Sequence, residues 1–466
     1  MSQTENNRVP FWVKFGYGGG EGSNSLIWTL FYIFFLFYLT DVVKIKPATA
    51  GLIIMIGVVW DAISDPLIGI WSDNLKWKWG RRRPLLLLVA VPFGILAWLL
   101  FTDFGLSGTG TVIYFTFAVI AYMTAFTILS VPYTAMAAEM TQDYDERTSL
   151  ISYRTVWSMV ASVIGAGLPL SLVSLFTETF GSQKIGWSLT AAIFGLASIF
   201  PILLTWRVTR GYELFPDQLT VKWRDIKEAF FGNRPFRFVM GIWACGIIAI
   251  NISSAAAVYF FSYRMGFSED ESSVAFIIFM CASIFWIPII NKTTHRLGKR
   301  TAFVIFMGIW AVVSAFPMLM VDRGDIVFLY ILLFFAAMGN SGIYLLGWSM
   351  IPDVIEVDEF KTGQRREGLY FGIISFVQKL GSAIAIWLIG IILSWIGYTP
   401  GAVQSNTAIW GIRLIFAEGT AFFAILAVVI CLLSPMNRER HQALIKAIAE
   451  KKTNQENNLD LIKDLL

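Results

Sequence analysis

The chain has 466 residues, of which 56% are hydrophobic, 15% aromatic and only 15% charged, and its mean hydropathy is +0.65. This composition is too apolar for an ordinary soluble protein and predicts a polytopic membrane protein. The net charge of +4 gives no indication of nucleic-acid binding, and all three cysteines lie in apolar runs, so no disulfide framework is implied.

Apolar runs separated by polar breaks predict twelve membrane-spanning helices. The first six are expected near residues 17–40, 50–71, 85–102, 110–138, 152–176 and 186–206. The second six are expected near residues 236–262, 271–291, 301–320, 326–350, 367–396 and 406–434. The first ten residues are polar and no short apolar stretch ends in a small-residue cleavage site, so no cleavable signal peptide is expected.

The distribution of cations between the loops predicts the orientation. Connections from odd to even spans carry few of them, namely Lys44, Lys46, Lys184, Arg264 and Arg323. The other loops and the tails carry most of the rest, including 76–83, 207–237, 292–300 and 361–366. Because Lys and Arg mark cytoplasmic loops, both termini are predicted to be cytoplasmic, in a multi-pass protein of the cell (inner) membrane.

Two carboxylates lie within the second apolar run. Asp61 and Asp65 are four residues apart and therefore share one face of a helix. Each costs about 2.5 to 3.5 kcal/mol at membrane depth, so a compensating positive charge is expected. A bound cation or proton would supply it. The alternative is a neighbouring Lys or Arg that pairs with them only for assembly.

The stretch DPLIGIWSDNLKWKWGRRRP, from Asp65 to Pro84, resembles the loop between spans 2 and 3 of the major facilitator superfamily. The preceding WDAISDP narrows the resemblance to the glycoside-pentoside-hexuronide:cation symporter family. The resemblance runs from Gly16 to the end of span 12 and is also strong at DVIEVDEFKTGQRREGL. It implies an all-α major facilitator fold with twelve transmembrane helices in two pseudo-symmetric six-helix bundles.

An internal repeat supports the same architecture. DNLKWKWGRR after span 2 is matched by NKTTHRLGKR after span 8, at an offset of about 220 residues. The expected domains are an N-terminal bundle (1–206), a cytoplasmic linker (207–235), a C-terminal bundle (236–434) and a cytoplasmic tail (435–466). The tail from Met436 is expected to form a short amphipathic helix with a solvated face at the membrane surface, followed by a flexible end.

The expected cation site lies between Asp61 and Asp65, with hydroxyl help from Ser64 and Thr127, and would bind a sodium ion or a proton. Lys379 lies about a dozen residues into a long apolar helix, where a buried ammonium needs a carboxylate. The family has a lysine at this place, which implies that Lys379 neutralises Asp61 or Asp65 when the cation is absent.

Substrate-binding residues are expected from the resemblance together with their polar or aromatic character, because sugars need hydrogen bonds and ring surfaces. They are Glu21, Asn24, Ser130, Arg154, Trp157, Asn251, Tyr344 and Gln378. Close helix packing can account for the glycines around Glu21, and snorkelling to the interface can account for Arg154, which is expected to open span 5. Melibiose permeases have aspartates at the positions of Ser130 and of Ser23 or Asn24, so galactoside specificity is not implied.

A cytoplasmic gate is expected between helix ends. Its residues are Asp73, Arg81, Arg82, Arg83, Glu139, Asp143 and Arg147.

The sequence therefore predicts a secondary active transporter that couples inward sodium or proton movement to uptake of a glycoside, pentoside or oligosaccharide. A sodium-coupled lysophospholipid symporter is the nearest alternative, although it needs an apolar cavity. An intramembrane aspartyl protease needs carboxylates from separate helices, whereas these share one. No Walker motif or paired Cys or His ligands are present, so a pump driven by nucleotide hydrolysis is not expected. We expect a transporter and no enzyme, with no cofactor besides the coupling cation, no nucleic acid partner, and a monomer in membrane lipid. The sequence leaves open the sugar, the driving cation, the stoichiometry and the oligomeric state.

Overall fold

The computed structural model describes residues 9–212, 229–452 and 465, apart from 76, 78–80, 142 and 365. Every regular element within these residues is helical. Some parts of the predictions lie outside the described residues: residues 1–8 of the N-terminal bundle, Lys76 and Lys78 of the cation cluster, residues 213–228 of the linker, and 453–464 and 466 of the tail.

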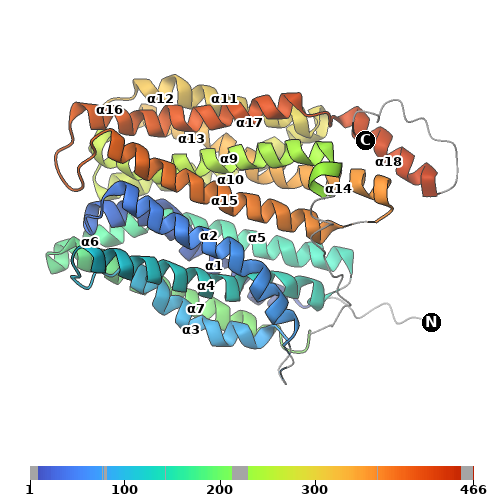
Figure 1. The fold of residues 1–466 in the computed structure, drawn as a ribbon, viewed down its shortest axis with the longest axis horizontal. Coiled ribbons are helices and arrows are strands. Elements are labelled where there is room, and N and C mark those ends of the chain that lie inside the picture. Colours follow the sequence, from blue (N-terminus) through green and yellow to red (C-terminus); the bar gives the residue numbers. More distant parts are fainter. Residues whose placement is uncertain are drawn as a thin grey trace. The chain divides into compact units, whose positions relative to one another are not determined.

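Twelve helical segments in the described part of the chain are long and apolar enough to cross a membrane, which confirms the expected number of spans. The first six spans are built from α1 (Phe11–Phe37), the π-helical turn η1 (Tyr38–Val42), α2 (Pro47–Asp73), α3 (Arg83–Leu100), α4 (Thr109–Met140), α5 (Tyr144–Gly167), α6 (Pro169–Phe180) and α7 (Gln183–Val208) (Figure 1). Prolines stand in the first turn of α2, α3 and α6, where a missing N–H costs nothing.

The second six spans begin at α9 (Arg234–Tyr259), which the π-helical turn η2 (Phe260–Met265) extends. They continue with α10 (Glu269–Leu297), α11 (Lys299–Ala315), α12 (Pro317–Met320), α13 (Ile326–Gly342), η3 (Ile343–Gly347), α14 (Trp348–Thr362), α15 (Glu367–Trp395), α16 (Asn406–Leu414), η4 (Ile415–Gly419) and α17 (Thr420–Leu433). A further helix, α18 (Arg438–Lys452), follows the last span.

Contacts divide the chain into two compact units. The first unit comprises Met1–Gln218, Phe261–Ile277 and Ile386–Ala408, and the second comprises Leu219–Phe260, Ile278–Ala385 and Ile409–Leu466. The expected domain boundaries follow the internal repeat rather than contacts, and they stay a prediction.

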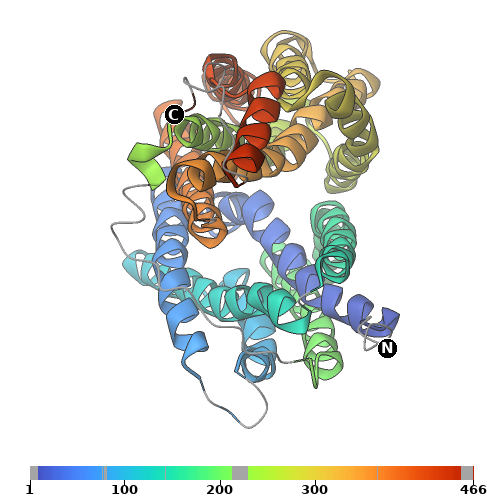
Figure 2. The ribbon, with the colours of Figure 1, turned by 90° about the vertical axis from the view of Figure 1, so that its right-hand side faces the viewer.

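In the first unit, α1 is the buried helix, and it packs against α5 and α7 (Figure 2). Its glycines make this close approach possible. A Cβ on Gly18 would lie 2.4 Å from Cδ1 of Trp157, and one on Gly22 would lie 2.8 Å from Cε3 of the same ring. The glycine run therefore has the packing role that small residues have between membrane helices.

In the second unit, aromatic side chains fill the space that glycines leave. Gly339 lies under the ring of Trp310, and Gly347 lies under the ring of Trp243. Both tryptophans are fully buried in a core that α9, α11, α13, α14, α15 and α17 line together.

Several spans extend further at the predicted cytoplasmic side than expected, and spans 5 and 10 show the physical reasons. α5 begins at Tyr144 because the Asp143 side chain caps it, accepting a hydrogen bond from the backbone N–H of Glu146 at 2.9 Å. The expectation that Arg154 opens span 5 is therefore wrong, since this residue lies well inside the helix.

Span 10, expected to end near residue 350, continues through Thr362. Its last turns carry acidic side chains that would ordinarily end an apolar span. Two of them are neutralised by partners outside the helix: Asp353 pairs with Lys299, and Asp358 pairs with Arg366, both at 2.6 Å. A hydropathy average counts each acidic residue as a cost and does not include the partner that neutralises it. The predicted span 10 therefore ended too early.

The tail forms a helix as expected, and exposed residues such as Lys446 give it a solvated face. Its place at a membrane surface stays a prediction, and its other face packs on the protein. Leu444 and Ala447 of α18 are buried against Val357 and Phe360 of α14. This apolar contact attaches the tail to the end of span 10.

Candidate functional site

The predicted cation site is built on the neighbouring helices α2 and α4. Asp61 is fully buried, and its Oδ1 accepts a hydrogen bond from Oγ1 of Thr127 at 2.8 Å. The hydroxyl oxygens of Ser64 and Thr127 lie 3.0 Å apart. Three of the four predicted residues are thus brought together, with oxygen atoms from two helices.

Asp65 is half-buried and lies one turn beyond Asp61 on α2. Pro66 follows it inside the helix. Because proline has no N–H, the backbone carbonyl of Ala62 loses its usual intrahelical partner. The prediction overlooked this carbonyl, although a proline four residues later was a visible signal.

These groups are carboxylate, hydroxyl and carbonyl oxygens, which are the ligands that hard cations prefer. A proton on a buried carboxylate would satisfy the same site, because it also removes the cost of a charge at this depth. The donor set therefore fits a sodium ion or a proton, and it contains no sulfur or imidazole.

An ion pair lies between α1 and α5 in the first unit. Nε of Arg154 donates to Oε2 of Glu21 at 2.5 Å, and the guanidinium lies 5.4 Å from the centre of the Tyr133 ring. Both charged side chains are partly exposed, at 26% for Arg154 and 18% for Glu21. Arg154 is therefore directed to a partner inside the protein rather than to a membrane interface.

Two tyrosines that were not predicted, Tyr17 and Tyr133, pack beside this ion pair. Tyr17 and Tyr133 stack with ring centres 4.8 Å apart, and each hydroxyl donates to the other residue's backbone carbonyl, at 3.1 and 2.8 Å. Tyr17 stands within the glycine run and Tyr133 directly follows Pro132, so only their positions beside predicted residues could have indicated them.

The remaining predicted substrate residues of the first unit have different surroundings. Trp157 packs on the glycines of α1, which gives it a structural role. Asn24 is buried on α1, and Ser130 is half-buried on α4.

In the second unit, Asn251 is buried on α9. Its Nδ2 donates to the backbone carbonyl of Ile247 at 2.8 Å and to Oγ of Ser382 at 3.1 Å, which commits both amide hydrogens to packing between α9 and α15. Tyr344 is 42% exposed, and its ring makes an edge contact with Trp243. Gln378 and Lys379 are half-buried on α15.

Lys379 belongs to the second unit, whereas Asp61 and Asp65 belong to the first. The pairing of Lys379 with these carboxylates stays a prediction.

The expected gate is an ion-pair cluster in the first unit. Glu139 is buried and accepts from Arg81 at 2.5 Å and from Arg82 at 3.1 Å. Arg82 also pairs with Asp73. Arg83 instead donates to the backbone carbonyl of Trp206 at 2.6 Å.

Two predicted gate residues have local roles. Asp143 caps α5, and Arg147 donates to the backbone carbonyl of Thr141 at 3.3 Å.

A second buried carboxylate, Asp41, lies at the C-terminal end of the first span and is surrounded by hydroxyl groups. This cluster was not predicted. Asp41 is buried in η1, and its carboxylate accepts from Thr40 at 2.6 Å, from Tyr398 at 2.5 Å and from Tyr263. The two tyrosines come from the second half of the sequence but belong to the first unit. We call Asp41, Tyr263 and Tyr398 the outer clasp, because they tie helix ends together opposite the cation-rich loops.

Twelve apolar spans make this a multi-pass membrane protein, and a buried carboxylate–hydroxyl cluster and an arginine–carboxylate cluster are features that fit the transporter class. The family model for MFS/sugar transport proteins matches residues 16–438, and the chain belongs to this family.

The chain is similar to an uncharacterized symporter of Synechocystis sp., at 28% identity over 97% of this chain and 99% of the relative. It is also similar to a glucuronide carrier protein homolog of Escherichia coli (strain K12), at 25% identity over 99% of each chain. Among solved structures, a bacterial homolog of the human lysosomal transporter Spinster superposes with a TM-score of 0.69 at 14% identity, covering 94% of this chain and 98% of that one. The last likeness shows the fold alone, and it confirms the expected major facilitator architecture.

Proposed function

We propose that this protein is a symporter that couples inward movement of sodium ions or protons to uptake of a glycoside, pentoside or oligosaccharide by alternating access. The observation that carries the proposal is the buried Asp61 carboxylate with the hydroxyls of Ser64 and Thr127 around it. A carboxylate costs about 2.5 to 3.5 kcal/mol at membrane depth, so a site of this kind is maintained at the expense of stability. Reversible cation binding is a function that explains the cost.

The energy available to such a carrier is sufficient. One charge that moves through about 100 mV yields about 2.3 kcal/mol, and a tenfold ion gradient adds about 1.4 kcal/mol. Together they support accumulation of several hundredfold. The coupling cation needs no further cofactor, and a monomer in lipid is sufficient for the proposal.

The Arg154–Glu21 pair and the adjacent Tyr133 ring support a sugar as the substrate. Charged donors and acceptors can exchange hydrogen bonds with hydroxyl groups, and an aromatic face can stack on the C–H face of a sugar ring. The relative named as a glucuronide carrier homolog agrees with this substrate class, and the relative named as a symporter agrees with coupled transport. No observation favours the lysophospholipid or protease alternatives.

The cation-rich loops support cytoplasmic termini, by the same charge asymmetry that the sequence displays. In this orientation the arginine gate is cytoplasmic and the outer clasp faces the opposite side. Alternating access would then require the two clusters to open in turn.

The test is transport by the purified protein in lipid vesicles, with a panel of labelled glycosides and with imposed sodium or proton gradients. Asp65→Asn should abolish gradient-driven accumulation and leave some exchange of substrate across the membrane. Asp270→Asn is the matched control, because Asp270 is an exposed carboxylate in the first turn of α10. Normal accumulation by Asp65→Asn would contradict the cation site, and no gradient-driven uptake of any sugar by the unmodified protein would contradict the symporter.

A further inference from the structure

The tail helix α18 meets the end of α14 through one histidine. Nε2 of His441 lies 2.7 Å from Oε2 of Glu356 and 3.5 Å from Oδ1 of Asp353. Lys299, at the start of α11, donates from Nζ to the same Asp353 oxygen and to the backbone carbonyl of Ser349, both at 2.6 Å. We call His441, Glu356, Asp353 and Lys299 the tail cluster.

With both carboxylates ionised, the charges of the tail cluster balance when the histidine carries a proton. Two carboxylates then face one ammonium and one imidazolium, whereas a neutral imidazole leaves an excess negative charge in a half-buried setting. The ammonium of Lys299 already pairs with Asp353. One further positive charge, supplied by a proton on His441, would pair with Glu356.

The hydrogen bond to Glu356 raises the pKa of His441 above its ordinary value, burial opposes the rise, and the charges of Asp353 and Glu356 add to it against that of Lys299. A raised pKa in the docked state means that protonation strengthens docking. The contribution is fully present below the ordinary histidine pKa of about 6.5, and it is lost as the pH rises through the raised value.

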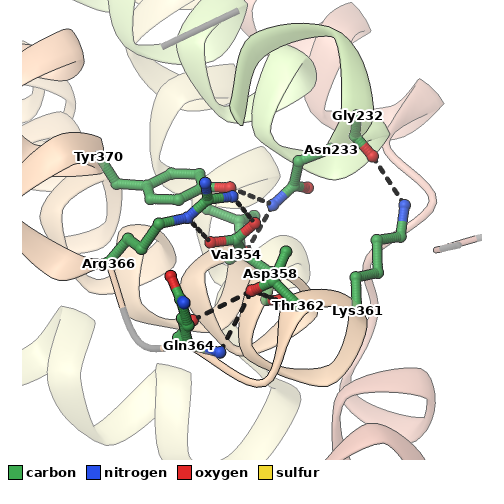
Figure 3. A network of polar contacts seen from close by, with 9 residues as sticks. All are labelled: Gly232, Asn233, Val354, Asp358, Lys361, Thr362, Gln364, Arg366 and Tyr370. Carbon is green, nitrogen blue, oxygen red and sulfur yellow. Dashed lines mark hydrogen bonds and ion pairs between the residues drawn. The ribbon is translucent and has the colours of Figure 1, made fainter. Parts of the chain in front are cut away.

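The same end of α14 is joined to two other helices on its remaining faces (Figure 3). Asp358 accepts two hydrogen bonds from Arg366, at 2.9 and 2.6 Å, just before α15 begins. Nδ2 of Asn233, the residue that caps α9, donates to the backbone carbonyl of Val354 at 2.7 Å. A contact that holds this end of α14 therefore also acts on the starts of α9 and α15.

Apolar packing positions α18 on α14, but this packing does not depend on pH. Leu444 and Ala447 are buried against Val357 and Phe360, which makes a small core of few residues. Arg438 in the first turn of α18 also donates to the backbone carbonyl of Arg296 at 3.0 Å. These contacts are few, so the charge-assisted hydrogen bond of His441 can shift the docked fraction as its proton is gained or lost.

We propose that the tail helix α18 is a proton-dependent brake: protonated His441 docks it on α14, and the docked helix slows transport when the cytoplasm becomes acidic. The docking of α18 is independent of the proposed function, whereas the slowing of transport rests on the proposed function. The brake acts because α14 cannot rearrange freely while it is tied to α18 and α11 together with α9 and α15.

Docking is measured first, by the distance between two spin labels in the full chain in lipid nanodiscs. Lys446→Cys on α18 and Lys292→Cys on α10 place the labels at exposed positions of the second unit, in a background in which Cys245, Cys281 and Cys431 are replaced by serine or alanine. We expect one narrow distance at acidic pH and a second, broad population at alkaline pH. The docked-to-free ratio should change about fivefold, as for one partly exposed charge-assisted hydrogen bond.

The controls use the fact that the chain has only two histidines. His441→Gln should remove the pH dependence, and Glu356→Gln should reduce it by removing the acceptor charge. His295→Gln should behave like the unmodified protein, because His295 is exposed on α10 and lies outside the tail cluster. Equal pH dependence in His441→Gln and His295→Gln would overturn the proposal. So would loss of the pH effect on adding a chelator, since it would indicate a metal ion instead of a proton.

Transport is measured second, as substrate exchange in vesicles without any net ion gradient and with the internal pH varied. Exchange by the unmodified protein and by His295→Gln should slow at acidic internal pH, and exchange by His441→Gln should slow less. Equal slowing of all three would overturn the brake even if docking follows pH. Absence of exchange in all three at every pH would instead count against the proposed function, while the distance measurement would still decide docking.

Discussion

Replacing Asp61 by asparagine should separate function from stability. The amide keeps the size of the side chain and still accepts from Thr127, but it removes the buried charge. Removing a carboxylate at membrane depth recovers about 2.5 to 3.5 kcal/mol. The variant also replaces a charge-assisted hydrogen bond of about 1.5 to 3 kcal/mol by a neutral one of about 0.5 to 1.5 kcal/mol, and this loss offsets part of the gain. The free energy of unfolding should therefore rise by about 1 to 2 kcal/mol.

The same variant should lose stabilisation by the coupling cation. A ligand that binds only the folded protein adds about 2.7 kcal/mol when its concentration is a hundred times its dissociation constant. The assay is thermal unfolding in detergent, with sodium exchanged for choline at constant ionic strength and in a separate pH series. The unmodified protein and Asp270→Asn should respond to sodium or to acid, whereas Asp61→Asn should respond to neither.

Two results would refute this reasoning. A clear fall in the melting temperature of Asp61→Asn would show that the carboxylate holds the helices together and is not kept for a cation. An undiminished sodium or acid response would place the cation elsewhere in the chain.

Three further predictions concern Arg82, Lys379 and Tyr398. Arg82→Gln removes a partner of the buried Glu139 and should change the maximal transport rate more than the apparent affinity for substrate; a pure affinity loss would contradict a gate. Lys379→Ala should damage net uptake more than exchange, because exchange does not visit the empty carrier, and equal losses per folded protein would refute a surrogate cation. Tyr398→Phe removes one donor from the buried carboxylate of Asp41 and should lower the free energy of unfolding by about 1 to 3 kcal/mol, measured by thermal unfolding; an unchanged value would show that the outer clasp contributes little.

The sequence by itself determined the number of spans, because a bilayer requires long apolar helices and hydropathy is a local property. It also determined that Asp61 and Asp65 share a face, since helical periodicity fixes neighbours three and four residues apart. The repeat and the WDAISDP and WGRRRP motifs led to the family that the model match then showed.

Only the tertiary structure decided which distant groups meet. Asp41 reaches Tyr398 across 357 positions of the chain, and no local pattern contains that partner. Tyr17 and Tyr133 exchange hydrogen bonds across 116 positions for the same reason.

The end of span 10 shows the physical cause most directly. Read alone, its acidic residues indicate that the helix leaves the apolar region. Lys299 of α11, His441 of α18 and Arg366, just before α15, pair with them. The cost of a charge depends on what surrounds it, and those surroundings are set by packing between helices that are far apart in sequence. The helix therefore continues through Thr362, and the tail docks on it.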